Sequence, residues 1–238
     1  MSVDPVKLAT HYGRSAKTTL PRHLGTRYDT AGNFLPEPGN TVVCHLVSGS
    51  ATERALASAR ERYQAMPDAR KLAFTPVNSY HMTLFQGITE GRRMLPYWPS
   101  DMASDAPIEA MTAHYLERLA EFEPAAPFAV ELVEALPTGL IVAGATVADR
   151  HAMAEWRNRF AEAFGYRHPD HDNYELHITM AYMIDWLDDA AIPVWTAMLN
   201  DVAAEIRAEA PVLELRAPAF CSFADMNWFE ERIVFAGD

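Results

Sequence analysis

Cysteine is scarce in this chain, and its scarcity excludes two classes of protein. Cys44 and Cys221 are the only 2 cysteines in 238 residues, and both lie in apolar, strand-like stretches. There is no Cys-x-x-Cys pair, so the sequence does not indicate a redox dithiol or a cysteine-based zinc site. A disulfide-stapled secreted domain needs more cysteines than this. We expect both thiols to be reduced core residues of a cytosolic protein.

Basic charge and long apolar runs are also lacking. The net charge is −12 and the sequence pI is about 5.2. A protein that binds long duplex nucleic acid normally carries a basic face, so that partner is disfavoured. No run approaches the ~20 apolar residues of a membrane span, and residues 1–41 lack the apolar stretch of a signal peptide. We therefore expect a cytoplasmic monomer without a membrane partner, whose ligand is a small phosphorylated molecule or a short RNA end.

What remains is an ordinary globular composition, with 49% hydrophobic residues, 22% charged residues and 11 glycines. Pro, Gly, Asn and Asp cluster at residues 29–40, so residues 1–40 are predicted to form an irregular arm. Residues 41–238 are predicted to form a single domain with two lobes. A chain of this length buries about 70% of its unfolded surface.

Hydrophobic periodicity and turn residues predict the following order of elements. A strand at 41–47 precedes a helix at 51–66, a strand at 79–88, a loop at 89–105, a helix at 107–122 and a hairpin of strands 128–136 and 140–146. A helix at 147–164, a polar loop at 166–173, a strand at 174–184 and a helix at 188–209 follow, with final strands at 212–216, 220–223 and 229–236.

Two of these strands carry the same short motif, His-x-Thr. His81 and Thr83 lie in the first, and His177 and Thr179 in the second. Side chains alternate between the faces of a strand, so each imidazole shares a face with its hydroxyl, roughly 7 Å away. With 9 His and 15 Thr in 238 residues, chance supplies about 0.6 such pairs, so one motif alone has little weight.

The position of the motifs within a repeat gives them more weight. The histidines are 177 − 81 = 96 residues apart, and the helices expected before them begin 96 residues apart, at Ala51 and Val147. The order helix, motif strand, helix, hairpin occurs twice, which indicates an internal duplication. We therefore predict an α+β fold with two related lobes, each with a mostly antiparallel sheet flanked by helices.

The motifs in this context resemble those of the two-histidine (2H) phosphoesterase superfamily. The resemblance rests on Tyr80-His81-Met82-Thr83-Leu84 and on Glu175-Leu176-His177-Ile178-Thr179-Met180-Ala181-Tyr182, and is closest to a poorly characterised bacterial-type branch. The superfamily includes 2′-5′ RNA ligase-like proteins and cyclic nucleotide phosphodiesterases. It implies a central cleft that carries both His-x-Thr strands, with His81, Thr83, His177 and Thr179 as the active site.

These four side chains suit hydrolysis of a phosphodiester. One imidazole can take a proton from water while the other protonates the leaving ribose oxygen, and both roles are accessible near neutral pH. The two hydroxyls can donate to the non-bridging phosphate oxygens. No metal ion or other cofactor is required. The residues leave the roles of the histidines open, and the resemblance assigns His177 as base and His81 as acid.

Four further residues are predicted to bind substrate: Phe85, Arg92, Tyr97 and Trp98. Phe85 shares the face of Thr83 and can stack on a base, although filling the floor of the cleft is an equal alternative. Arg92, Tyr97 and Trp98, with Arg93, can form a lid that grips a phosphate; the alternative is an exposed loop with its Trp packed on the surface.

Other candidates are assigned structural roles. His168, Asp170, His171 and Asp172 have the side chains of a metal site but are interpreted as a solvated polar loop. Tyr174 and Tyr182 are predicted to pack. His45 is predicted to be buried and hydrogen-bonded.

The sequence thus favours a metal-independent 2′,3′-cyclic phosphodiesterase acting on nucleotides or short RNA ends. A 2′-5′ RNA ligase or phosphodiesterase-like activity, or a nucleotide-binding sensor with little turnover, are the alternatives. Retention of two proton-transfer groups argues against a sensor.

Overall fold

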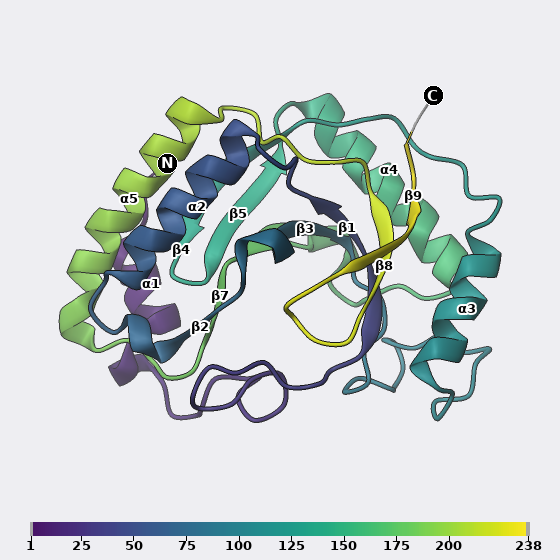
Figure 1. Ribbon diagram of the computed structural model, residues 1–238, viewed down its shortest axis with the longest axis horizontal. Coiled ribbons are helices and arrows are strands. Elements are labelled where there is room, and N and C mark those ends of the chain that lie inside the picture. The colour runs from purple at the N-terminus through teal and green to yellow at the C-terminus, as the bar shows by residue number, and fades with distance from the viewer. Residues whose placement is uncertain (1, 237–238) are drawn as a thin grey trace.

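The backbone of the protein is organised around one antiparallel sheet of seven strands (Figure 1). The computed structural model describes residues 2–236. The sheet has the order β4-β5-β6-β3-β1-β8-β9, formed by β1 (Gly39–His45), β3 (His81–Phe85), β4 (Val130–Leu136), β5 (Gly139–Gly144), β6 (His177–Thr179), β8 (Ala219–Phe223) and β9 (Glu230–Val234). The predicted α+β class, with antiparallel sheets flanked by helices, is confirmed.

Five α-helices flank the sheet in two groups. These are α1 (Pro5–Tyr12), α2 (Ala51–Gln64), α3 (Ile108–Arg118), α4 (Val147–Phe164) and α5 (Ile192–Glu209). Helices α1, α2 and α5 lie together at the left of Figure 1, and α3 and α4 at the right. Among the residues that the structure covers, no helix combines the length and the apolarity needed to cross a membrane.

The internal repeat is visible at the centre of the sheet, where the two motif strands are neighbours. β3 pairs with β6 through Met82 and Ile178, which are equivalent positions of the repeat because 178 − 82 is also 96. A pseudo-twofold axis therefore passes between these two residues. It relates β1, α2, β3, α3 and β4 to β5, α4, β6, α5 and β8. The predicted duplication is confirmed.

Local sequence explains why the equivalent helices α2 and α4 begin where they do. The side chain of Ser50 accepts a hydrogen bond from the backbone of Glu53 at the start of α2. Thr146 and Asp149 form a reciprocal capping box at the start of α4. Both arrangements satisfy backbone N–H groups that have no partner within the helix. Gly165 then ends α4 in the left-handed conformation.

The core lies on the faces of the motif strands that point away from the motif side chains. Met82, Leu84, Ile178 and Met180 are all fully buried there, as the alternation predicted. Both cysteines are free thiols in the core, which confirms their structural interpretation.

The second motif strand differs from the prediction of one strand over residues 174–184. It divides at Met180 into β6 and β7 (Ala181–Met183), and β7 pairs with β2 (Leu72–Phe74) in a separate two-stranded sheet. The backbone N–H groups of Met180 and Ala181 both donate to the carbonyl of Thr138 in the β4–β5 turn. The strand changes sheet at this point, which no local pattern in the sequence indicates.

The prediction of an irregular N-terminal arm was wrong for α1. Asp4 caps this helix, Pro5 occupies its first turn, and Leu8 is buried in the core. Two further elements differ from the prediction. Helix α3 ends at Arg118 rather than at 122, and residues 212–216 make only isolated bridges, at Leu213 and Leu215.

Candidate functional site

The four motif side chains meet on one face of the central strand pair. The pairing of Met82 with Ile178, extended by one residue in each direction, places His81 opposite Thr179 and Thr83 opposite His177. Each hydroxyl therefore lies beside the imidazole of the other lobe. The two histidines are diagonal neighbours, and such pairs have Cα atoms about 7–8 Å apart.

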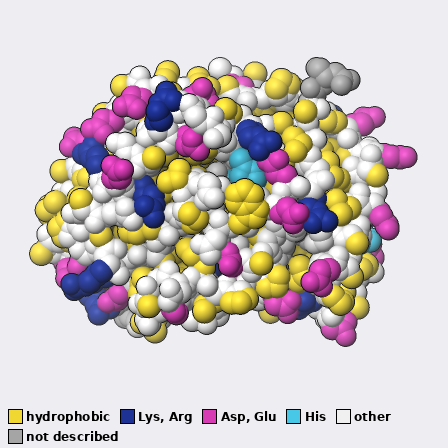
Figure 2. Space-filling view, viewed as in Figure 1, with side chains coloured by type: hydrophobic (Ala, Val, Ile, Leu, Met, Phe, Trp, Pro, Cys, Tyr) yellow, Lys and Arg dark blue, Asp and Glu magenta, His cyan; other side chains and the backbone are white. Residues whose placement is uncertain are grey.

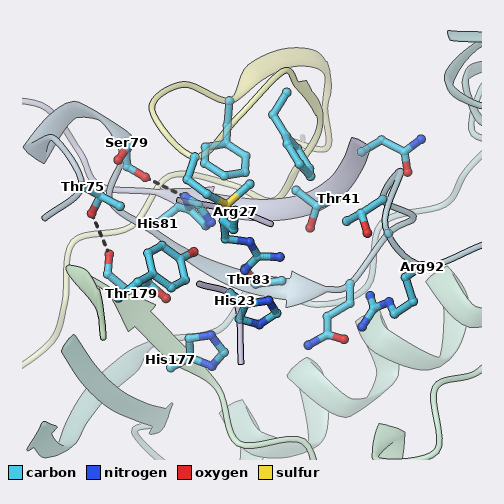
Figure 3. Close-up of a pocket in the computed structure, with 18 of the residues that line it drawn as sticks. His23, Arg27, Thr41, Thr75, Ser79, His81, Thr83, Arg92, His177 and Thr179 are labelled. Atoms are coloured by element: carbon cyan, nitrogen blue, oxygen red, sulfur yellow. Dashed lines mark hydrogen bonds between the residues drawn. The ribbon is translucent and has the colours of Figure 1, made fainter. Parts of the chain in front are cut away.

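These residues line a pocket of about 300 Å³ (Figure 3). Its walls come from the arm, from β1, from the segments that flank β3 and from the β8–β9 connection. Besides His81, Thr83, His177 and Thr179, it is lined by Arg22, His23, Arg27, Asn40, Thr41, Thr75, Ser79, Gln86, Gly87, Thr89, Arg92, Tyr174, Tyr182, Phe223, Met226 and Phe229. None of these lining residues is Asp or Glu, although the whole chain carries a net charge of −12.

The two histidines are held in the same tautomer. Nδ1 of His81 lies 2.7 Å from the backbone carbonyl of Ser79, and Nδ1 of His177 lies 3.1 Å from that of Glu175. A carbonyl oxygen only accepts hydrogen bonds, so Nδ1 carries the proton in each ring. Nε2 is thus the free nitrogen of each imidazole, with its lone pair available for proton transfer.

Burial distinguishes the two rings. The ring of His81 packs against Phe229, with centroids 4.2 Å apart, and lies 5.9 Å from the ring of His45. Burial, followed by the neighbouring His45 and His177, lowers the pKa of His81 to about 3. His81 is therefore a neutral imidazole near neutral pH. His177 lies nearer the solvent, beside Tyr174.

Phe85 is not part of the pocket, although it was predicted to bind substrate. Val42 pairs with Phe85 and Val43 with Thr83, so β3 has one extra residue, Leu84, at a bulge. A bulge interrupts strict alternation, which the prediction assumed. Phe85 is turned into the aromatic core, where its ring lies 5.2 Å from that of Phe164.

Of the three predicted lid residues, Arg92 lines the pocket, and Tyr97 and Trp98 do not. Arg92 lines the pocket and lies over the ring of Tyr97, 4.8 Å from its centroid. Tyr97 does not line the pocket. Trp98 is buried beneath Arg93, and its indole N–H donates to the carbonyl of Met102. Arg92 is thus the member of this group that the structure places beside the motifs.

Sequence reasoning missed the contribution of the arm. Arg22, His23 and Arg27 line the pocket. The one available signal was the concentration of basic residues before position 28 in an otherwise acidic chain. Tyr174 and Tyr182 also line the pocket, where only packing had been predicted.

The polar loop before β6 also differs from the prediction. His168 and His171 are buried, each 5% exposed, rather than solvated. Within residues 2–236, no group of three or more His, Cys, Asp or Glu side chains is arranged to hold a metal ion. His45 behaves as predicted: it is largely buried, and its Nδ1 lies 3.0 Å from a carboxylate oxygen of Glu231.

Comparison with known proteins supports the resemblance. Residues 27–141, which include the first motif, match the family model of a domain of unknown function, DUF1868, labelled 2H-phosphodiesterase. The crystal structure of the conserved protein of unknown function ATU0111 from Agrobacterium tumefaciens strain C58 is 49% identical, with a TM-score of 0.95. That match covers 97% of this chain and 99% of the other, so it extends over both motifs.

The chain belongs to the 2H phosphoesterase superfamily. No curated protein matches it. The label of this 2H family indicates an activity of the phosphodiesterase type.

Proposed function

We propose that this 2H protein hydrolyses a small cyclic phosphodiester, most simply the 2′,3′-cyclic phosphate of a nucleotide or of a short RNA end. The observation that carries the proposal is the pair of imidazoles, diagonal across two strands, each with a free Nε2 and a threonine hydroxyl beside it. This arrangement suits in-line displacement, in which the attacking and leaving oxygens lie on opposite sides of phosphorus.

In the proposed reaction, His81 acts as the base. Burial keeps its Nε2 unprotonated near neutral pH, and the Nε2 lone pair is the position from which a base takes the proton of the attacking water. The water oxygen bonds to phosphorus while the bond to one ribose oxygen breaks. Protonated His177 donates its Nε2 proton to that oxygen. These roles reverse those that the family resemblance implied.

The hydroxyls of Thr83 and Thr179 donate to the non-bridging oxygens, where negative charge increases in the transition state. Thr83 lines the pocket, and its hydroxyl makes no side-chain hydrogen bond to residues 2–236, so it is free for this role. The pocket volume of about 300 Å³ is at the lower end of the range for small-molecule sites, which favours a ligand of nucleotide size over an oligomer.

Surface charge supports the same choice of ligand. Figure 2 shows Lys, Arg, Asp and Glu side chains interspersed over one face of the molecule rather than gathered into a basic patch. A duplex would need such a patch to contact several phosphates at once. A single nucleotide needs only the local cations of the pocket.

The test is hydrolysis of the four nucleoside 2′,3′-cyclic phosphates, with a 2′-5′-linked dinucleotide as comparison. His81→Ala and His177→Ala should each reduce kcat by about 10³-fold, the range for loss of a general acid or base. His151→Ala is the control, because this exposed histidine of α4 makes no side-chain hydrogen bond within residues 2–236.

Treatment with EDTA should leave the wild-type rate unchanged. Strict dependence on an added metal ion would contradict the mechanism. Wild-type rates in either histidine variant would contradict the assignment of that residue.

A further inference from the structure

The proposed reaction does not use the cations on the arm side of the pocket. Arg22 and Arg27 come from the arm and Arg92 from the segment after β3, and all three line the pocket. A cyclic diester carries a single negative charge and is already contacted by the motif side chains. The pocket therefore holds more positive charge than that substrate needs.

The arm is fixed in place before any ligand binds. Tyr28 is 2% exposed, and its hydroxyl donates to the carbonyl of Met183 on β7 at 2.6 Å. Its ring stacks on that of Tyr182, with centroids 5.4 Å apart. The backbone N–H of Leu35 donates to the carbonyl of Arg27 and closes the loop. The arm cations are thus presented by an ordered loop.

Of these cations, one has a carboxylate partner among residues 2–236. Arg27 pairs with Glu37 and lies over Tyr182, so its charge is satisfied. Neither Arg22 nor Arg92 makes a side-chain hydrogen bond or ion pair within residues 2–236, and Nε of Arg92 is buried without a partner. Two guanidinium groups are left without a counter-ion.

The titration of the neighbouring groups agrees with this excess of positive charge. Burial, and then Arg27 and Arg22, lower the pKa of His23 to about 4. Burial also lowers the pKa of Arg92, and Arg22 and Arg27 add to the effect. Guanidinium groups gathered at a site without a counter-ion are stabilised when an anion binds between them.

Arg92 lies away from the histidines that would hold the reacting phosphate. Figure 3 shows Arg92 on the opposite side of the pocket from His81, with Thr83 between them. A phosphate held by the two histidines and a second anionic group near Arg92 can therefore occupy the pocket together.

We propose that Arg22 and Arg92 bind a second phosphate group of the substrate, a dianionic phosphomonoester. This rests on the proposed function and specifies its substrate class. The substrate is then a nucleoside 2′,3′-cyclic phosphate that also carries a 5′-phosphate. Guanidinium groups suit this role because their donor geometry matches phosphate oxygens.

The first experiment compares adenosine 2′,3′-cyclic phosphate with its 5′-phosphorylated form. The wild type should prefer the phosphorylated compound by about 30-fold or more in kcat/KM, through a lower KM, as expected for two charge-assisted contacts. Arg22→Gln and Arg92→Gln should each reduce that preference by about 10-fold. Arg70→Gln removes an exposed arginine without side-chain partners in residues 2–236 and should keep the wild-type ratio.

A binding measurement separates failure of this inference from failure of the proposed reaction. Adenosine 5′-monophosphate and adenosine are titrated calorimetrically into His177→Ala, with and without Arg92→Gln. Tighter binding of the monophosphate that Arg92→Gln abolishes supports the second phosphate site, even if neither cyclic compound is hydrolysed. Equal affinities for the two ligands would overturn it, and hydrolysis of both cyclic compounds at equal rates would overturn it while leaving the phosphodiesterase proposal intact.

Discussion

At the scale of single residues, two copies of one motif occupy different environments. The backbone contacts of the two histidines are equivalent, since each Nδ1 bonds to the carbonyl two residues earlier. Their surroundings are not. Phe229, from the β8–β9 connection, packs on His81, whereas His177 lies at the more open edge of the pocket. Duplication thus supplies two similar side chains, and packing gives them different surroundings.

The motif threonines give a test at the same scale. Thr83→Val and Thr179→Val keep the shape of the side chain but remove its hydroxyl, so each should lower kcat by about 10²-fold and leave KM within about twofold. Steady-state kinetics on the cyclic substrate measures both constants. Thr196→Val on α5 should leave both unchanged, because that hydroxyl donates to the carbonyl of Ile192 on its own helix. An effect confined to KM would show that the hydroxyls bind ground state and transition state equally.

At the scale of elements, the β4–β5 hairpin holds the second motif strand in position. Gly139 pairs with Thr179 across β5 and β6 and has a φ of 143°, in the region that favours glycine. A Cβ there would lie 2.0 Å from the carbonyl oxygen of Ile178. Helix α4 supports the other end of the site, because the buried Arg157 donates to the carbonyls of Leu84 and His171.

Gly139→Ala should therefore lower the free energy of unfolding by about 2–4 kcal/mol through backbone strain and steric overlap. It should also reduce activity, because β6 must move and carry His177 with it. Denaturant unfolding measures the first effect and kinetics the second. Gly91→Ala is the matched control, since its Cβ would meet only Glu37, at 3.6 Å, in ordinary contact. Equal stability of the two variants would contradict this role of Gly139.

At the scale of the whole molecule, several histidines are buried in neutral form. His168 lies among the rings of Phe85, Tyr97 and Tyr166. Burial, and then the nearby Arg92, lower its pKa to about 4, and burial lowers that of His171 to about 4 as well. In the unfolded chain these groups regain a pKa near 6.5, so below that pH the unfolded state binds more protons than the folded state.

The fold should therefore lose stability as the pH falls from about 6.5 to about 4, by roughly 1 kcal/mol per pH unit for each such histidine. Urea unfolding at several pH values tests this. In His168→Phe, the phenylalanine ring suits the aromatic surroundings and has no titratable nitrogen. The stability of this variant should therefore depend less on pH. His151→Phe, on the exposed face of α4, should leave the slope unchanged. A pH-independent wild type would contradict neutral burial of these histidines.

The sequence by itself determined the features that depend on local spacing. Alternation within a strand places His81 with Thr83 and His177 with Thr179, and the 96-residue offset reveals the duplication and with it the family. Hydrophobic periodicity likewise predicts α2 and α4. These signals are local because they follow from the geometry of one element or from repetition along the chain.

Only the tertiary structure decided what depends on contacts between distant segments. The bulge at Leu84, defined by pairing with β1, turns Phe85 away from the pocket. The docking of Tyr28 on β7 brings Arg22 and Arg27 to motifs more than fifty residues away in sequence. Packing of His81 against Phe229 buries its imidazole, and burial lowers its pKa and keeps the ring neutral. Side-chain burial and charge clustering arise from long-range packing, which a pattern along one chain segment does not encode.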